Sequence, residues 1–319
     1  MNSVLTPKVS VIIPTYNRAH LIRRSIKSVL NQTYKNIELI VVDDSTDDTE
    51  LKVKEIKDDR LIYIKNNQRM GVSKARNMAI EVSTGELIAF QDSDDEWSED
   101  KLEKQVNLLL KSPSDVAAVY CGMEFFDANN HEKIGEDLTE IDFRKSYTED
   151  GLLQTPATQT VLIKKSVLNE VGYFNEQLRA AEDTELAIRV SKKYLYAFVK
   201  EPLIKVARNH DSLMGNAKNY LFAYEFICEK HKDFLSNKIL FNLNKVLANY
   251  WILKGDYKKA KCFIKKALRN KFDLKTLAQY SAVEIAPFLL KYAYVKKYKN
   301  GIPHPTQPGQ VISDERKDY

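Results

Sequence analysis

The sequence predicts an α/β protein in which a mostly parallel sheet carries helices on both faces and is followed by an all-α C-terminal region. Three observations carry this prediction. Short apolar stretches alternate with segments of helical periodicity over residues 8–110, which is typical of a parallel sheet built from βα units. Polar clusters follow the apolar stretches. From residue 217 onward, apolar residues recur at helical spacing alone.

The first half of the chain supplies the elements of the parallel sheet. We expect buried strands at the apolar stretches Lys8–Ile13, Ile37–Val42, Leu61–Ile64 and Leu87–Phe90. We expect the covering helices at Ala19–Asn31 and Asp47–Lys57, from Gly71 through Ile80, and at Lys101–Leu110.

A polar cluster stands at the carboxyl end of each expected strand. These clusters are Thr15–Asn17, Asp43–Asp44, Asn66–Asn67 and Asp92–Asp95. Ligands of open α/β sheets bind beyond the carboxyl ends of the strands, so the clusters predict one shared pocket. The chain has neither a G-x-G-x-x-G sequence after the first strand nor a G-x-x-x-x-G-K sequence. A nucleotide in this pocket would therefore be held by side chains and metal.

The acids at the end of the fourth strand point to a cation. Asp92, Asp94 and Asp95 crowd one turn, and neighbouring carboxylates repel one another. A Mg²⁺ or Mn²⁺ ion that bridges to a phosphate would relieve the repulsion, because these ions prefer oxygen ligands. The alternative is a solvated turn that caps the next helix.

Composition narrows the class of protein. The formal net charge of the 319 residues is +5, which by itself gives no reason to expect a nucleic acid partner. Three cysteines stand far apart, without a C-x-x-C pair, so we expect neither a disulfide framework nor a zinc site. The first residues lack the pattern of a signal peptide, and no apolar run approaches the roughly 20 residues of a membrane span. We expect a cytoplasmic protein, with peripheral contact at the inner face of the membrane as a further possibility.

The middle of the chain is less regular. Ala117–Phe126 and Thr160–Ile163 are expected strands, and the polar stretch Asp127–Gln154 is expected to pass over the pocket mouth without a clear element. Asp183 stands at a helix start, where it could be a simple N-cap. His210 is either a packed histidine or a metal ligand.

The C-terminal region is expected to be helical, at Tyr220–Glu229, Ile239–Leu253, Tyr257–Arg269 and Leu274–Tyr294. The lysines of the third helix form either a solvated face or a patch for an anionic membrane surface. We divide the chain into a catalytic domain at 1–215, a helical domain at 216–298 and a disordered tail at 299–319. The helical domain would serve assembly as a homo-oligomer, acceptor contact or membrane contact.

Together the clusters resemble the family 2 glycosyltransferases, inverting enzymes of the GT-A fold, which is Rossmann-like. The matching stretches are VSVIIPTYNR, SVLNQTY, ELIVVDDSTDDT, NNQRMGVSKARNMAI, GELIAFQDSDDEW and AAEDTELAIRV. They occur in the order and at the spacing of the family, and they cover about residues 8–215.

The resemblance assigns roles in donor binding. Pro14 and Tyr16 are implied to line the base and ribose. One of Asp43 and Asp44 is implied to hydrogen-bond the base, and we choose Asp44. Asn67 is implied to face the nucleotide. A uridine diphosphate sugar is favoured by the resemblance only.

The resemblance also assigns the reacting end of the site. Arg76 is implied to face the diphosphate, and Asp92 to contact the ribose and sugar. Asp94 is implied to hold the metal, Mn²⁺ or Mg²⁺, with His210 as a further ligand. Asp183 is implied to be the general base that takes the proton of an acceptor hydroxyl on a glycan, glycolipid or glycoprotein. One base without an enzyme nucleophile implies a single displacement with inversion.

Two other classes of protein are alternatives to this family. A phosphotransfer enzyme of the haloacid dehalogenase type would need D-x-D-x-[TV] after the first strand, where this chain has Pro14–Asn17. A non-catalytic module would bind a nucleotide sugar or act as a scaffold through its helical half, but every acid that the family expects is present.

Overall fold

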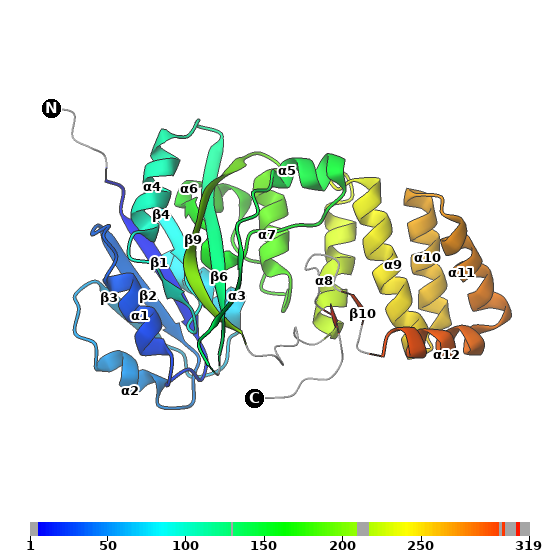
Figure 1. Cartoon of the computed structure of the whole chain (residues 1–319), viewed down its shortest axis with the longest axis horizontal. Helices are drawn as coiled ribbons and strands as arrows, with labels where there is room; N and C mark the ends of the chain where they lie inside the picture. The colour runs from blue at the N-terminus through cyan, green and yellow to red at the C-terminus, as the bar shows by residue number, and fades with distance from the viewer. Residues whose placement is uncertain (1–5, 129, 209–216, 300–301, 304–310, 313–319) are drawn as a thin grey trace. The chain divides into compact units, whose positions relative to one another are not determined.

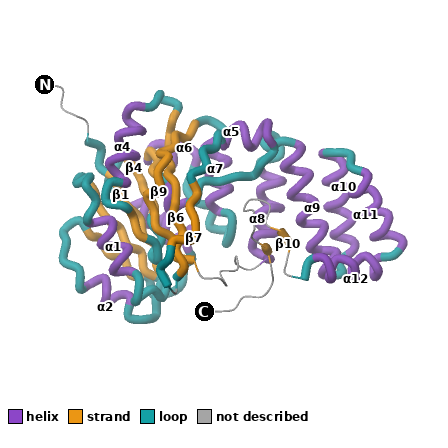
Figure 2. Tube along the Cα trace, viewed as in Figure 1, coloured by secondary structure: helices purple, strands orange, loops and turns teal. Residues whose placement is uncertain are grey.

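The computed structural model describes residues 6–128, 130–208, 217–299, 302–303 and 311–312. The chain forms two compact units, which we describe separately. Unit 1 comprises Met1–Asp142, Pro156–Gln177 and Arg189–Ser212, and unit 2 comprises Phe143–Thr155, Leu178–Ile188 and Leu213–Tyr319. Unit 1 contains the large sheet, and unit 2 is predominantly helical (Figures 1 and 2).

Across the described residues, the sheet of unit 1 has nine strands, and it confirms the α/β prediction. Its parallel half consists of β1 (Val9–Thr15), β2 (Ile37–Asp43), β3 (Leu61–Lys65) and β4 (Leu87–Phe90). These strands lie in the order β3-β2-β1-β4, with β1 between β2 and β4. The carboxyl ends of β1, β2 and β4 therefore meet at one edge.

The other half of the sheet is mixed. β8 (Leu162–Lys164) pairs antiparallel with both β4 and β6 (Val116–Asp127). β6 then runs parallel to β9 (Leu195–Arg208). Two short strands complete the sheet: β5 (Glu96–Trp97) on β9 and β7 (Lys133–Asp137) on β6, both antiparallel.

Helices cover both faces of the sheet, and the residues of β1, β2 and β4 are almost all buried, whereas those of the edge strand β3 are partly buried or exposed. Val9, Val11 and Ile13 of β1 pack in one core with buried residues of α1 (Ile22–Leu30), α2 (Thr49–Lys54) and α4 (Lys101–Lys111). α3 (Val72–Val82) also contacts β1 and β2, but its buried residues lie outside that core. Since side chains alternate along a strand, α3 covers the opposite face.

A buried polar cluster fixes the N-terminal ends of β1 and β2. Glu38 is 4% exposed and accepts hydrogen bonds from Lys8, Ser10 and Thr84. Gly85 lies so close that a Cβ atom there would stand 2.7 Å from the carbonyl oxygen of Lys8. Only glycine permits this approach without a shift of the backbone.

Unit 2 confirms the predicted all-α region. It contains α8 (Ala217–Lys230), α9 (Asn237–Lys254), α10 (Tyr257–Asn270), α11 (Leu274–Ile285) and α12 (Pro287–Lys297). Within the tail, β10 (Ile302–Pro303) pairs antiparallel with β11 (Val311–Ile312).

Side-chain caps and one proline set the helix boundaries of unit 2. Ser236, Asp256 and Asp273 accept hydrogen bonds from backbone N–H groups in the first turns of α9, α10 and α11. The expected single helix Leu274–Tyr294 is two helices. Pro287 begins the second, because proline lacks the N–H that a continuous helix requires and restricts the residue before it.

The polar stretch 127–154 contains more structure than its sequence predicts. Besides β7, it contains α5 (Phe143–Lys145) and a turn of π-helix at Ser146–Asp150. Phe143 and Tyr147 are buried and anchor this segment in unit 2. Two further helices, α6 (Lys165–Val171) and α7 (Glu182–Ser191), follow it. Among the described residues, none of the helices combines the length and the apolar character that crossing a bilayer requires.

Candidate active site

The loop after β1 is tied to the loop after β2. Asn17 adopts a left-handed backbone conformation, with φ of 52°, which asparagine tolerates better than most residues. Its N–H donates to Ser45 Oγ at 2.8 Å, and its side-chain oxygen accepts from Thr46 N at 2.9 Å. The two loops are therefore held in one conformation before any ligand binds.

Asp43 is a structural acid at the end of β2. It is 0% exposed and accepts hydrogen bonds from Tyr63 Oη at 2.6 Å, Ser45 N at 2.7 Å and Lys65 Nζ at 3.1 Å. Burial alone would raise the pKa of Asp43, but the hydrogen bonds from Ser45, Tyr63 and Lys65 outweigh it and lower that pKa. Asp43 thus joins β2 to β3 as a carboxylate.

Asp44 arranges the connection between β3 and α3. Its Oδ1 accepts from Asn66 Nδ2 at 2.7 Å, and its Oδ2 accepts from the N–H groups of Met70 and Gly71 at 2.8 and 3.0 Å. Gly71 has φ of 90° and precedes the first residue of α3, so glycine suits this turn. Two carboxylate oxygens offer about four lone pairs. The three hydrogen bonds therefore leave Asp44 one acceptor position.

A stacked pair lies beside these loops. The guanidinium of Arg69 stands 4.1 Å from the ring centroid of Tyr16, a cation–π contact. Of the other residues assigned to the nucleoside, Pro14 is half-buried and Asn67 is exposed to solvent. The planar Tyr16 and Arg69 groups could stack on a nucleobase.

At the end of β4, two acids are paired with arginines. Arg76 of α3 is 5% exposed, and its Nη2 lies 3.3 Å from Oδ1 of Asp92. Arg18 Nε lies 3.6 Å from Oδ2 of Asp94. The side chains of Asp92 and Asp94 are 34% and 44% exposed. These carboxylates therefore remain accessible to a solute, unlike that of Asp43, which is fully buried.

Asp95 is the third acid of this turn and the most buried. Burial and the nearby Asp92 and Asp94 carboxylates raise the pKa of Asp95 well above its usual range. Its backbone is fixed by Gln91, whose side chain donates to the Asp95 carbonyl at 2.7 Å. Asp95 therefore supports the turn from inside.

The acid turn fits a metal that is shared with a phosphate. Within the described ranges, no group of three or more His, Cys, Asp and Glu side chains is arranged to hold a metal ion. Magnesium is commonly bound through one or two carboxylates together with substrate phosphates. The partly exposed oxygens of Asp92 and Asp94 are such donors. His210, the further ligand expected from the sequence, lies outside the described residues.

Asp183 belongs to unit 2, where it is the second residue of α7. It is therefore not the N-cap that one interpretation of the sequence suggested. Ala181, the residue before the first residue of α7, has φ of 52°. This conformation is strained for alanine, and such strain is found more often near functional sites. Burial raises the pKa values of Tyr147 and Tyr220, and the Asp183 carboxylate raises both further. Asp183 is thus near two phenol groups of its own unit.

Three residues of this arrangement had no individual role assigned from the sequence: Arg18, Arg69 and Asn66, the last of which stood in a predicted polar cluster. Arg18 and Arg69 pair with predicted site residues, and Asn66 donates to Asp44. Each stands next to or within two residues of a named position, in YNR or NNQR. Proximity in sequence was the available signal, but the pairings depend on strands that are distant along the chain.

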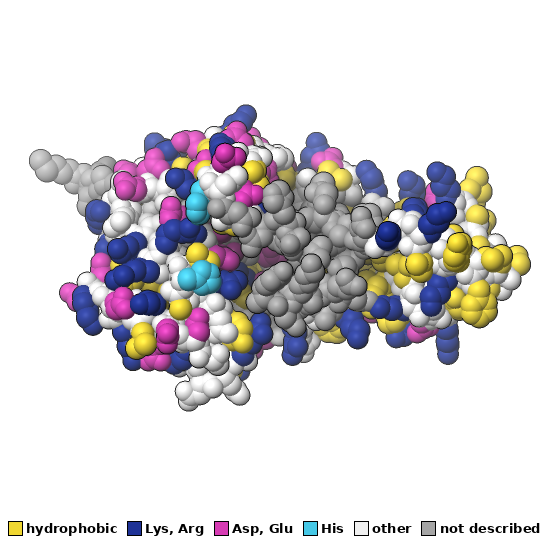
Figure 3. Space-filling view, turned by 60° about the horizontal axis from the view of Figure 1, so that its bottom comes forward, with side chains coloured by type: hydrophobic (Ala, Val, Ile, Leu, Met, Phe, Trp, Pro, Cys, Tyr) yellow, Lys and Arg dark blue, Asp and Glu magenta, His cyan; other side chains and the backbone are white. Residues whose placement is uncertain are grey.

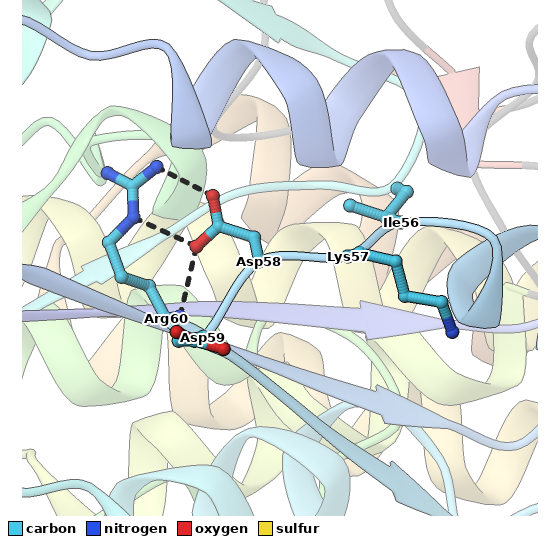
Figure 4. A pocket seen from close by; sticks show the side chains of 5 residues that line it. All are labelled: Ile56, Lys57, Asp58, Asp59 and Arg60. Atoms are coloured by element: carbon cyan, nitrogen blue, oxygen red, sulfur yellow. Dashed lines mark hydrogen bonds and ion pairs between the residues drawn. The ribbon is translucent and has the colours of Figure 1, made fainter.

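A hollow at the connection between α2 and β3 has a structural explanation. It is lined by Ile56–Arg60 (Figure 4). The Asp58 carboxylate accepts from the backbone N, Nε and Nη2 of Arg60. These bonds fold the loop on itself, so we do not place ligand chemistry there.

Comparison with known proteins supplies the family. The family model for glycosyl transferase family 2 matches residues 10–172. The Escherichia coli UDP-Glc:alpha-D-GlcNAc-diphosphoundecaprenol beta-1,3-glucosyltransferase WfgD is 38% identical over 168 residues. That match spans 52% of this chain and 63% of WfgD, less than two thirds of its length.

A second relative and a solved structure agree. Bacillus subtilis TuaG, a putative teichuronic acid biosynthesis glycosyltransferase, is 31% identical over 239 residues, 70% of this chain and 90% of TuaG. The crystal structure of S. aureus TarS 1-349 in complex with UDP-GlcNAc aligns over 93% of each chain, with a TM-score of 0.67 and 19% identity. At that identity the likeness shows the fold, which is GT-A. The chain accordingly belongs to glycosyltransferase family 2 and is a glycosyltransferase.

Proposed function

We propose that this glycosyltransferase moves a sugar from a nucleoside diphosphate sugar, with uridine as the favoured base, to a hydroxyl group of a glycan acceptor. The transfer is a single displacement that inverts the anomeric configuration. The observation that carries the proposal is the pairing of Asp92 with Arg76 and of Asp94 with Arg18 at the carboxyl end of β4. A diphosphate needs both cationic groups and metal-binding carboxylates, and this turn offers both.

The nucleoside end of the donor is assigned to the loops after β1, β2 and β3. Pro14 and Tyr16 line the base and ribose, and Arg69 adds a second planar group over Tyr16. Asp44 accepts a hydrogen bond from the base through its remaining acceptor position. Asn67 faces the nucleotide from the exposed side of the β3–α3 connection.

The diphosphate end is assigned to α3 and to the acid turn. Arg76 is buried and held by Asp92, so its charge is preorganised for the phosphates. Asp92 contacts the ribose and sugar. Asp94 holds a divalent cation, Mn²⁺ or Mg²⁺, with His210 proposed as a further ligand. Such an ion neutralises negative charge on a leaving diphosphate.

The acceptor end is assigned to Asp183. Its carboxylate takes the proton of the acceptor hydroxyl as the oxygen forms a bond to the anomeric carbon. The bond from that carbon to the diphosphate oxygen breaks, and its electron pair leaves with the nucleoside diphosphate. A positioned general base contributes about 10²–10⁴-fold in rate. Its place in the first turn of α7 puts the carboxylate at the positive end of the helix dipole.

The activity of the relative WfgD suggests the acceptor class. That enzyme acts on a sugar linked through diphosphate to undecaprenol. We propose a lipid-linked glycan of a cell-surface polysaccharide as acceptor here. In this scheme residues 1–215 are the catalytic domain, and residues 216–298 serve the acceptor, assembly or membrane contact.

A panel of sugar nucleotides tests the donor assignment. Thermal unfolding is followed with uridine and guanosine diphosphate sugars, each with Mn²⁺ or with chelator. A matching donor at 100 times its Kd stabilises the fold by about 2.7 kcal/mol, and chelator should remove most of this effect. If no sugar nucleotide stabilises the protein under any condition, the donor proposal is wrong.

Asp183→Asn tests the base. The variant should lose about 10²–10⁴-fold in kcat and keep the donor Kd, because asparagine cannot take the proton. Glu176→Gln in unit 1 is a control for loss of one carboxylate outside the proposed site. An equal loss of donor affinity in Asp183→Asn would contradict the base role, and retention of anomeric configuration in the product would contradict the single displacement.

A further inference from the structure

The last helices of unit 2 expose large apolar side chains. Ile285, Phe288 and Leu289 are 83%, 78% and 73% exposed, and Tyr292 and Val295 are also exposed. We call these five residues the α12 face. Figure 3 shows hydrophobic side chains gathered at the end of the molecule where α11 and α12 lie. None of the residues of α12 is buried, which is unusual for a helix with this apolar content.

The α12 face has the geometry of an interfacial helix. At about 100° per residue, Phe288, Tyr292 and Val295 form one stripe, with Leu289 beside it. Lys291 and Lys296 fall on the two sides of this stripe, and Lys296 lies between Tyr292 and Leu289 on the helix surface. An apolar stripe bordered by lysines, with tyrosine on it, is typical of helices that lie in the plane of a lipid–water interface.

The charges around the α12 face are mostly positive. Residues 271–299 contain six lysines but only two acids, Asp273 and Glu284. Asp273 accepts from Thr276 in the first turn of α11, and Glu284 pairs with Lys261 at 3.0 Å. Lys296 and Lys299, at the end of this segment, are exposed. The surface is therefore apolar and cationic together.

The lysines of α10 are a weaker candidate for the same role. Lys261 and Lys266 pair with Glu284 and Glu229 at 3.0 and 2.6 Å. Lys259 stands over the ring of Trp251 at 3.9 Å. The apolar residues of α10 are largely buried within unit 2. This helix offers charge without exposed apolar surface.

We infer that the α12 face docks on an anionic lipid bilayer, with α12 parallel to the membrane plane. Charge complementarity selects this occupant, since a negatively charged surface attracts the flanking lysines while the acyl region takes the apolar stripe. A second copy of the chain would bring like charges together at a symmetric contact. α12 has 11 residues, too few to span a bilayer, which takes about 20. The inference is independent of the proposed chemistry.

Vesicle sedimentation with the full chain tests the docking. Vesicles of phosphatidylcholine alone are compared with vesicles that also contain phosphatidylglycerol. The wild-type chain should bind the anionic vesicles, and binding should weaken as salt is raised. Phe288→Ser with Leu289→Ser, and separately Lys296→Gln with Lys299→Gln, should each reduce partitioning by about tenfold or more.

Matched variants control for composition and charge. Leu51→Ser with Leu110→Ser removes two exposed apolar side chains from unit 1, and Lys258→Gln with Lys265→Gln removes two charges from α10. Both should bind vesicles as the wild type does, and all four variants should unfold at the wild-type temperature. The inference is overturned if the wild type ignores anionic vesicles, binds both compositions equally, or keeps binding in the α12 variants. It is also overturned if light scattering finds a dimer that the α12 variants dissociate.

Discussion

The acid pairs after β2 and β4 have equivalent places on the sheet but different surroundings. Asp43 and Asp44 are buried, and each accepts three hydrogen bonds within unit 1. Asp92 and Asp94 are partly exposed and make longer ion pairs with Arg76 and Arg18, at 3.3 and 3.6 Å. A carboxylate whose oxygens are already occupied organises loops, whereas one that is loosely held can exchange its partner for a ligand.

Asp94→Ala should separate the two pairs most clearly. The transfer rate should fall by about 10²–10³-fold, a typical loss when one charged contact to the transition state is removed. Stability should change by no more than about 0.5 kcal/mol, because the side chain is exposed. Steady-state kinetics and thermal unfolding measure the two effects. Asp59→Ala, which removes an exposed acid from the α2–β3 connection, should change neither.

Asp43→Ala should show the opposite pattern. The substitution leaves the Lys65 ammonium and the Tyr63 hydroxyl without their shared acceptor inside unit 1. The free energy of unfolding should drop by about 3 kcal/mol, as measured by denaturant titration. A fully stable Asp43→Ala variant with lost donor binding would mean that Asp43, rather than Asp44, contacts the base of the donor.

A further buried acid, Glu38, extends the comparison to the opposite ends of the strands. Burial opposes its ionisation, but hydrogen bonds from Lys8, Ser10 and Thr84 lower the pKa of Glu38 to about 2. A lowered pKa in the folded state stabilises the fold above the pKa of the unfolded chain, near 4.5, and this contribution is lost as pH falls toward 2. We expect a loss of about 2–3 kcal/mol over this window.

Glu38→Gln provides the control for the pH measurement. Glutamine keeps the shape but cannot lose or gain the proton, so unfolding of this variant should depend less on pH between 4.5 and 2. Equal pH dependence in the two proteins would assign the acid sensitivity to other groups, with Asp43 the next candidate because its pKa is also lowered.

Much of the parallel half of the sheet could be predicted from the sequence. The apolar stretches that end at Ile64 and Phe90 correspond to β3 and β4 within one residue. Their length and apolar character identify both stretches as strands, although only β4 is buried throughout, and β3 at the edge of the sheet is partly buried or exposed. β9 was not predicted as a 14-residue strand. Only Leu203 and Ile204 of its residues are buried, and its pairing with β6 depends on contacts that no local pattern encodes.

The candidate site, like the fold, could be predicted from the sequence only in part. The polar clusters at strand ends could be located from the sequence, because a parallel sheet brings carboxyl ends to one edge. The sequence could not distinguish Asp43 from Asp44, since two adjacent acids look alike until their partners are known. The partners come from β3 and from the turn before α3. The role of Asp183 as general base stays a prediction.

By itself, the sequence determined the alternation of strands and helices, the edge of the sheet that carries polar side chains, and the helical character of unit 2. These features follow from periodicity and local chemistry, which each segment carries with it. Packing of distant segments settled which acids are buried among hydrogen-bond donors and which stay partly exposed. It also decided that α12 leaves its apolar face exposed. Both depend on which distant side chains are brought within contact, and that is a property of the packed chain.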